Sequence, residues 1–530
     1  MAAGTVMSRL TGFARTVALV AAVGTGVFAD TFNVANTTPN VLYILLVGGV
    51  LNAVFVPVLV RARKEDADGG EAYTQRLLTL TALLLLGLTV AAVLAAPLIV
   101  RLYISDFDPA ALEQATTFAR YVLPQIFFYG LFTIFGQVLN SRGRFGAMMW
   151  TPILNNLVVI VVCLLFLAAV SGPPEVGRVS AGEAALLGLG TTLGVIAQTV
   201  ALLPALRASG FRLRPRFGFR GAGLGTAGRL ARWTVLFVLV NQLGYLVIVN
   251  LATAAGASAA RAGADHGAGY TPYNAAYLLF LLPHAVVTVS IVTALLPRMS
   301  EHAADQRLDL VRDDVSTGLR LTAVALIPGS LGFAVLGPDL ATVAFSLGGA
   351  ASTADARFIG IVLAVFALGL VPFSGHHLVL RGFYAQQDTR TPVFLNVVLV
   401  SVNVVIALAL SRVLPADVLV VGLAAGYALS YWVGFLLSGR VLGRRLGGLE
   451  GARVLRTYVR LLVAGVAGAL AALLVVALVH RSADSGPAGS AMAVVGGGAA
   501  GAAVYLATAA GLRVTELTGL LTAVRGRLGR

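Results

Sequence analysis

Apolar runs of about 20 residues recur along the whole chain and constrain its fold more than any other feature. A helix that crosses a membrane needs about 20 mostly apolar residues. Only 12% of the 530 residues are charged, whereas soluble domains carry roughly 25%. The chain is therefore predicted to be an all-α integral membrane protein with about fourteen transmembrane helices. The expected spans are 10–32, 41–60, 77–103, 116–140, 151–171, 182–206, 231–253, 271–296, 318–337, 355–380, 391–411, 416–438, 458–480 and 489–511.

The basic residues are distributed unevenly over the loops between these runs. Every second loop is rich in arginine, whereas the loops between them, such as "NVANTTPN", hold few cations or none. Arginine and lysine collect on the cytoplasmic side of membrane proteins and near anionic headgroups. Both termini are therefore predicted to be cytoplasmic. The formal net charge of +15 is explained by these loop arginines, which would lie near the headgroups of anionic phospholipids. No nucleic-acid partner is therefore expected.

An internal repeat relates two parts of the chain. Pro57 and Pro152 are separated by as many residues as Pro297 and Pro392, and "TP" followed by "LN" occurs at both second positions. The offset covers six expected helices, so the copies would insert in the same orientation around a central cavity. The last two spans are rich in glycine and alanine, which favours close helix packing.

This reading predicts two pseudo-symmetric six-helix bundles plus two C-terminal helices. The expected segments are an N-terminal bundle at 1–206, a basic cytoplasmic loop at 207–230, a C-terminal bundle at 231–438, a second basic loop at 439–457, two extra helices at 458–511 and a basic cytoplasmic tail at 512–530.

A series of short motifs resembles the MurJ/MviN family of lipid II flippases, within the multidrug/oligosaccharidyl-lipid/polysaccharide exporter superfamily. The longest of them is "GFYAQQDTRTPV", and the order and spacing of the others extend the resemblance over all fourteen spans. The other motifs are Ser8-Arg9, Gly12–Arg15, Ala29–Phe32, Pro39-Asn40, Phe55–Pro57, Leu139-Asn140, Arg144-Phe145, Pro152 and Asn155.

The resemblance implies a flippase that moves lipid II, the undecaprenyl-pyrophosphate-linked peptidoglycan precursor, from the inner to the outer leaflet of a bacterial cytoplasmic membrane. It implies alternating access of the two bundles, cavity arginines that bind the pyrophosphate and a groove for the lipid tail at the C-terminal helices. Cell-wall synthesis proteins are possible partners.

Charged residues in the first expected span, or directly before it, are the main candidates for substrate binding. Arg9 and Arg15 either extend to the headgroups or face a hydrated cavity, because an unpaired arginine in hydrocarbon is costly. Guanidinium groups bind pyrophosphate through paired, charge-assisted hydrogen bonds. The resemblance places both arginines in the cavity. Asp30, at the far end, is expected to pair with a cation, gate the outer mouth or lie at the interface.

The cavity of this chain is expected to be less basic than the family pattern. Tyr43-Ile44 replaces a pair of arginines, Gly48 replaces an acidic residue, and Leu278 lies where the eighth span of relatives carries another arginine. Polar residues on the seventh and eighth spans are candidate replacements, although such residues more often form interhelical hydrogen bonds. They are Asn241, Gln242, Asn250, Asn274 and His284.

Four charged residues occupy matching cytoplasmic turns. Arg142, Arg144, Asp388 and Arg390 are candidates for an inner gate that closes by ion pairing, and ordinary loop charge explains them equally well.

No catalytic motif is present in the sequence, since it contains no P-loop, HExxH or GxSxG. We therefore expect no enzymatic activity, no cofactor and no metal, with Na⁺, H⁺ or the membrane potential left open as the source of coupling. Two alternatives stay open: export of another lipid-linked oligosaccharide or a drug, and a non-transporting membrane scaffold for cell-wall proteins.

Overall fold

The computed structural model describes residues 2–45, 70–104, 106–144, 146–217, 224–346, 349–482 and 486–517, and no strand is present among them. Eleven of the described helical segments are long and apolar enough to cross a membrane, or up to twelve if one bent helix pair counts as a single span. The protein is therefore an all-α, multi-pass membrane protein. The expected second span, 41–60, lies mostly outside the described residues, as does Pro57 of the repeat.

The chain divides into two compact units. Unit 1 comprises Met1–Ala262, Gly269–Thr271 and Gly348–Ala351, and unit 2 comprises Gly263–Ala268, Pro272–Leu347 and Ser352–Arg530. The bundle boundaries expected from the sequence stay a prediction.

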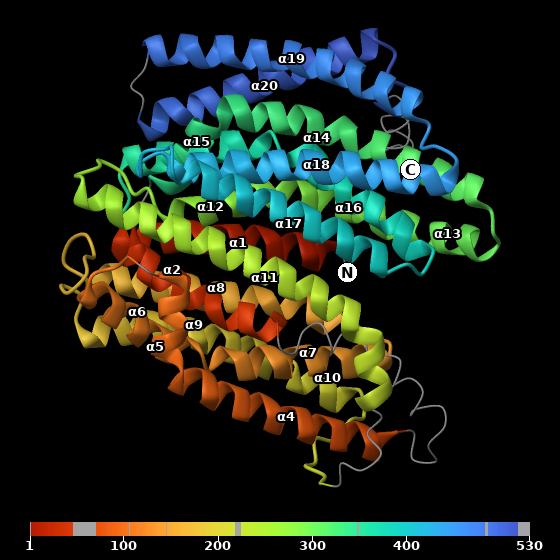
Figure 1. Ribbon diagram of the computed structural model, residues 1–530. Helices are drawn as coiled ribbons and strands as arrows, with labels where there is room; N and C mark the ends of the chain where they lie inside the picture. The colour runs from red at the N-terminus through yellow and green to blue at the C-terminus, as the bar shows by residue number, and fades with distance from the viewer. Residues whose placement is uncertain are drawn as a thin grey trace. The chain divides into compact units, whose positions relative to one another are not determined.

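Unit 1 is built from helices that pack in sequence-distant pairs (Figure 1). The helix α1 packs against α8, α2 packs against α6 and α7, and α11 packs against α2 and α5. The bounds of these helices are α1 Ala2–Val23, α2 Val27–Tyr43, α4 Glu71–Leu94, α5 Ala96–Tyr103, α6 Pro109–Val122, α7 Gln125–Ser141, α8 Gly146–Ala169, α9 Ala181–Val200, α10 Leu203–Ala208 and α11 Leu224–Arg261.

The first expected span, 10–32, is not one helix, which corrects the sequence prediction. The helix α1 ends at Val23, and α2 begins at Val27. Gly24 between them has a φ of +74°, and a Cβ on it would lie 2.8 Å from the carbonyl oxygen of Ala350. Only glycine adopts this backbone at little cost. Asp30 consequently lies in the first turn of α2.

Unit 2 is organised around the long helix α14, Leu308–Phe345. It packs against α15, α16, α19 and α20. The pair α15 and α16 is bent by 48°. The remaining bounds are α12 Tyr270–Pro283, the π-helix η2 His284–Thr288, α13 Val289–Ala304, α15 Thr353–Ala367, α16 Leu370–Ala385, α17 Arg390–Leu410, α18 Leu419–Leu446, α19 Gly451–Ser482 and α20 Pro487–Gly511.

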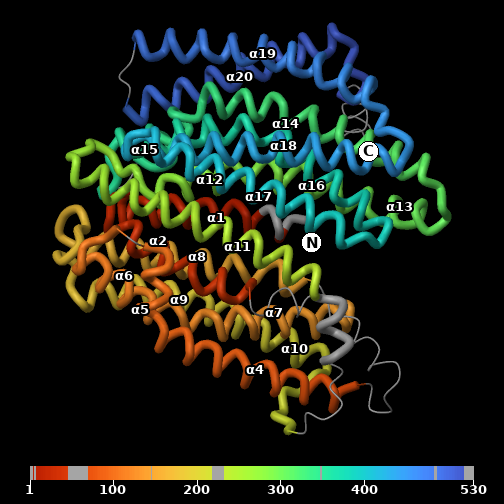
Figure 2. Tube along the Cα trace, viewed as in Figure 1, coloured from red at the N-terminus to blue at the C-terminus, as the bar shows by residue number. Residues whose placement is uncertain are grey.

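The two C-terminal helices, α19 and α20, lie side by side (Figure 2). Small residues form their contact: a Cβ on Gly468 would lie 2.6 Å from the carbonyl oxygen of Gly501. Such a close approach of two backbones requires glycine, and it is the packing mode that membrane helices favour.

Candidate functional site

The helix α1, which carries both candidate arginines, is fixed to α8 by a polar contact. The Asn156 amide donates hydrogen bonds to the Ser8 carbonyl at 3.2 Å and to the Thr11 hydroxyl at 3.0 Å. A Cβ on Gly12 would lie 3.6 Å from the same amide nitrogen. These contacts set the rotation of α1 about its axis and therefore the direction of its other side chains.

Arg15 is partly buried in unit 1, whereas Arg9 is exposed. The Nε atom of Arg15 is buried and has no hydrogen-bond partner among the described residues. The guanidinium acts electrostatically on the Tyr129 hydroxyl and on the Cys163 thiol. Tyr129 in turn donates a hydrogen bond of 3.3 Å to the Gln125 side chain. An arginine with a buried, unsatisfied N–H group is ready to bind an oxygen-rich anion.

Asp30 accepts several hydrogen bonds inside unit 1. The backbone N–H groups of Tyr270 and Thr271 donate to its carboxylate at 3.1 and 2.7 Å, and the Thr271 hydroxyl donates at 2.6 Å. The carboxylate thereby satisfies the free N–H groups at the start of α12 in the manner of a helix cap. Its binding partners in the structure are thus backbone and hydroxyl groups.

Two glycines make room for this carboxylate. A Cβ on Gly269 would lie 1.9 Å from Oδ2 of Asp30, and a Cβ on Gly256 would lie 3.0 Å from the same atom. The Gly256 position also faces the Gly269 backbone at 2.7 Å. Asp30, Gly256 and Gly269 therefore form one closely packed contact.

Tyr43, which the sequence comparison expected in place of a family arginine, is hydrogen-bonded within unit 1. Its hydroxyl donates to the Thr133 hydroxyl at 2.7 Å, and its ring packs 6.2 Å from the ring of Tyr129. The neutral Tyr43 therefore adds a hydroxyl, and no charge, to the polar side chains of Tyr129 and Gln125 near Arg15.

The five candidate replacements are divided between the two units. Asn241 donates to the Phe237 carbonyl of its own helix at 2.7 Å. Asn241, Gln242 and Asn250 lie partly buried on α11 in unit 1. Asn274 on α12 and His284 in η2 belong to unit 2. Their role in substrate binding stays a prediction.

Of the two gate candidates in unit 1, Arg142 contacts its own unit. Arg142 donates to the Ser209 carbonyl at 2.8 Å, and its guanidinium lies 5.1 Å from the ring centre of Phe211. Arg144 is exposed. The contacts of Arg142 hold the segment after α10 against the end of α7.

In unit 2, Asp388 forms an ion pair with Arg445 at 2.5 Å. The Thr391 backbone N–H and hydroxyl also donate to its carboxylate, at 2.9 and 2.6 Å. Burial raises the pKa of Asp388, but the hydrogen bonds from Thr391 and Arg445 outweigh it, so the net shift is downward. Arg390 donates its backbone N–H to Asp388, and its side chain lies over the ring of Phe394. Arg445 is the partner that the gate prediction missed.

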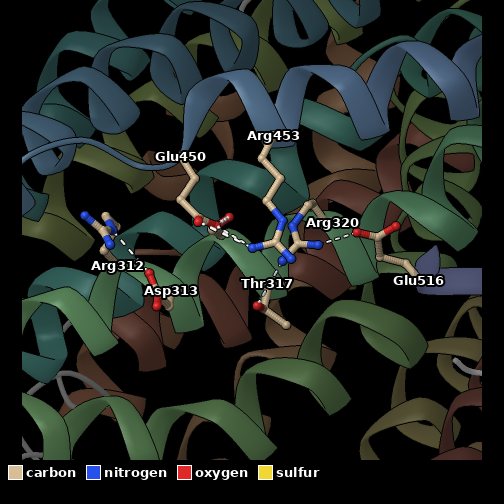
Figure 3. Close-up of polar contacts among 8 residues, drawn as sticks. Arg312, Asp313, Thr317, Arg320, Glu450, Arg453 and Glu516 are labelled. Carbon is tan, nitrogen blue, oxygen red and sulfur yellow. Dashed lines mark hydrogen bonds and ion pairs between the residues drawn. The ribbon is translucent and has the colours of Figure 1, made fainter. Parts of the chain in front are cut away.

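A buried ion pair in unit 2 was also missed by the sequence prediction (Figure 3). Arg320 on α14 pairs with Glu516, which follows α20, and the two side chains are 7% and 9% exposed. Nearby, Ser316 donates a hydrogen bond of 2.7 Å to Glu450, which precedes α19. These contacts fix both C-terminal helices to α14. The sequence signal was Arg320 itself, a cation located inside an apolar helix.

A second polar cluster joins the same helices nearer the other end of α14. Asp339 accepts hydrogen bonds from the Ser490 hydroxyl at 2.8 Å and contacts Nε2 of His480 at 2.9 Å. Asp339 comes from α14, His480 from α19 and Ser490 from α20.

Comparison with solved structures identifies the fold. The chain is similar to a structure described as "Lipid II flippase MurJ, inward closed conformation", with a TM-score of 0.73, 18% identity and coverage of 95% of this chain and 96% of that one. It is also similar to an inward-facing multidrug resistance MATE family transporter of the MOP superfamily, with a TM-score of 0.65, 14% identity and coverage of 83% and 95%. The fold is therefore that of MurJ and MATE transporters.

Curated relatives extend the comparison to sequence. A probable lipid II flippase MurJ of Rhizobium meliloti (strain 1021) is 29% identical over 441 residues, covering 82% of this chain and 77% of the relative. The lipid II flippase MurJ of Burkholderia cenocepacia is 28% identical over 399 residues, covering 73% of each. The family model described as "Lipid II flippase MurJ" matches residues 19–493. The chain therefore belongs to the MurJ family of lipid II flippases.

Proposed function

We propose that this chain moves lipid II from the inner to the outer leaflet of a bacterial cytoplasmic membrane, for cell-wall synthesis. The observation that carries the proposal is the family match over residues 19–493. The fold shared with MurJ and MATE transporters supports a mechanism of alternating access. The chain acts as a transporter and catalyses no reaction of its substrate.

The geometry of α1 supports a direct role for Arg15. Its buried Nε has no hydrogen-bond partner among the residues described, so a pyrophosphate oxygen would satisfy it. Charge-assisted hydrogen bonds of this kind are roughly twice as strong as neutral ones. Arg9 is exposed and would meet the headgroup earlier, near the cytoplasmic surface. Asp30 would act indirectly, by holding the Gly269–Thr271 segment in place.

The remaining parts of the proposal concern orientation, partners and coupling. Both termini face the cytoplasm, and the exposed arginines after α10 contact anionic phospholipids. Cell-wall synthesis proteins are partners at the membrane surface. Transport uses no bound cofactor and is coupled to Na⁺, H⁺ or the membrane potential.

The test is a leaflet-accessibility assay for lipid II in cells depleted of this protein. Depletion should cause lipid II to accumulate in the inner leaflet, and the wild-type chain should restore its appearance outside. Arg15→Ala, expressed at normal abundance, should fail to restore it, because the pyrophosphate loses a charge-assisted partner. Arg15→Lys should restore it in part, since it keeps the charge and loses the forked geometry.

Arg101→Ala is the matched control. Arg101 is an exposed arginine of unit 1, in the last turn of α5, so the same change of charge should leave transport intact. Full restoration by Arg15→Ala would refute the role of the arginine. Normal external lipid II after depletion would refute the flippase function itself.

A further inference from the structure

A partly open cavity of about 290 Å³ lies within unit 2, between the η2–α13 segment and α16. Small-molecule sites begin at roughly 300 Å³, so this cavity has room for a phosphate group. One wall is the π-helix η2, His284–Thr288. Single π-turns interrupt helices mainly at functional sites. The lining residues are His284, Thr288, Val289, Val292, Thr293, Leu296, Pro297, His377 and Arg381.

Two polar atoms of this lining are buried without a hydrogen-bond partner among the residues described. They are the Thr288 hydroxyl, whose residue is 1% exposed, and Nε of Arg381. A buried donor that makes no hydrogen bond is costly, and more so in a membrane protein, where surrounding lipid offers no replacement. The Arg381 guanidinium also lies 5.6 Å from the ring centre of Tyr384, a contact that provides no acceptor oxygen for Nε. Both atoms therefore point to an absent acceptor.

Two histidines complete the polar side of the cavity. Nδ1 of His377 donates to the Phe373 carbonyl at 2.8 Å, so Nε2 of the neutral ring is left as an acceptor, which can receive a hydrogen bond from a P–OH group. Nδ1 of His284 lies 2.9 Å from the Ser374 hydroxyl, and the two imidazole rings are 5.4 Å apart. No carboxylate is found among the described residues that line the cavity. The positive charge of Arg381 therefore favours an anion over a cation as the ligand.

We propose that this cavity binds the phosphate of a lipid-linked molecule through Arg381 and Thr288. An oxyanion would accept from both unsatisfied donors and neutralise the guanidinium, which a neutral ligand would not do. Val289, Val292 and Leu296 form an apolar wall beside these donors, which suits a phosphate carried on a lipid chain. The identification of that lipid as the transported substrate rests on the proposed function.

The first test measures binding of inorganic pyrophosphate to the full chain, purified in a phosphate-free detergent buffer, by calorimetry and by the shift of the thermal unfolding midpoint. The wild type should bind saturably. Arg381→Gln should weaken binding about tenfold or more, since a hydrogen bond to a charged group is lost. Thr288→Val, which keeps the shape and removes the hydroxyl, should weaken it by roughly three- to tenfold.

Arg440→Gln is the matched control, because Arg440 is an exposed arginine of unit 2 that does not line the cavity. It should bind pyrophosphate within about twofold of the wild type. The midpoint without ligand shows whether each variant is folded. If Arg381→Gln is not folded, Arg381→Lys takes its place in the test and should bind pyrophosphate with intermediate affinity. Absence of binding by the wild type, or equal weakening by Arg440→Gln, would overturn the proposal.

The second test identifies the source of the phosphate with nanodiscs of phosphatidylcholine. Displacement of pyrophosphate by added lipid II, but not by phosphatidylglycerol, supports a substrate site. Displacement by phosphatidylglycerol alone supports a site for a phospholipid headgroup. If neither lipid displaces pyrophosphate, the proposal that the ligand is carried on a lipid is overturned. The leaflet assay with Arg15→Ala does not depend on this cavity, so failure of the flippase function is distinguished from failure of the phosphate site.

Discussion

Replacing Asp30 by alanine tests whether this carboxylate is a structural cap. Asp30, Tyr270 and Thr271 are each at most 2% exposed. The substitution leaves two backbone N–H groups and one hydroxyl buried without an acceptor, and each such loss costs about 1–3 kcal/mol. Removal of a desolvated carboxylate offsets part of this cost. The free energy of unfolding should therefore fall by roughly 3–5 kcal/mol.

The packing of Gly269 against Asp30 allows a double-mutant cycle. Gly269→Ala places a Cβ 1.9 Å from Oδ2 of Asp30, so the carboxylate must leave its hydrogen bonds. In the Asp30→Ala background that oxygen is absent, and the added methyl group should cost much less. We expect a coupling free energy of about 1 kcal/mol or more between the two positions.

The assay is reversible unfolding of the purified chain in detergent, followed by tryptophan fluorescence. Glu113→Ala is the control, because Glu113 is an exposed carboxylate of unit 1, and surface substitutions change stability by about 0.5 kcal/mol or less. The cap would be refuted if Asp30→Ala unfolded like this control and Gly269→Ala cost the same in both backgrounds. Loss of lipid II transport without loss of stability would instead favour a direct role at the outer mouth.

Three further predictions concern unit 2. Arg320→Ala should destabilise by about 3–5 kcal/mol, because it leaves Glu516 buried and unpaired; hydrogen exchange of α20 should rise, and should rise less when Glu516→Ala is added. The lowered pKa of Asp388 means that its contact with Arg445 stabilises at neutral pH and is lost as the pH falls below the usual range of an aspartate. Between neutral pH and a pH of about 3, Asp388→Asn should therefore lose less free energy of unfolding than the wild type. An equal loss would contradict the role of the Asp388–Arg445 ion pair. Gly468→Ala should cost about 1–3 kcal/mol by overpacking against α20, and an unchanged unfolding midpoint would contradict that contact.

The fold could be predicted because its determinants are local. Apolar runs and the alternation of basic loops depend on residue type alone, and the membrane enforces both. The break after Val23 could not be predicted in the same way. It depends on the positive φ of Gly24 and on its contact with Ala350, which is far away in the sequence.

The same distinction between residue type and tertiary contact applies to the candidate site. The sequence identified Arg15 as a candidate, because an arginine in an apolar helix is rare and costly, and its role in binding stays a prediction. The partners of Asp30 could not be predicted, since Tyr270 and Thr271 are 240 and 241 residues away. Arg320 is a charge inside an apolar helix and could have been singled out, but its partner Glu516 lies in a C-terminal segment with no periodic pattern to place it. Charge identifies which residues need partners, and only the tertiary contacts say which partners they have.

The positions of the two polar clusters on α14 explain how the C-terminal helices are attached. Arg320 and Asp339 are 19 residues apart in the sequence, which corresponds to about 28 Å along an α-helix. This distance matches the roughly 30 Å hydrocarbon core of a bilayer. A bilayer centred between the two polar contacts would place both near the edges of its core, where charges cost least. Between them, a Cβ on Gly465 of α19 would meet Leu331, and one on Gly497 of α20 would meet Leu336. Because α19 and α20 contact α14 at both polar clusters and pack closely against it between them, we expect a movement of α14 during transport to carry both helices with it.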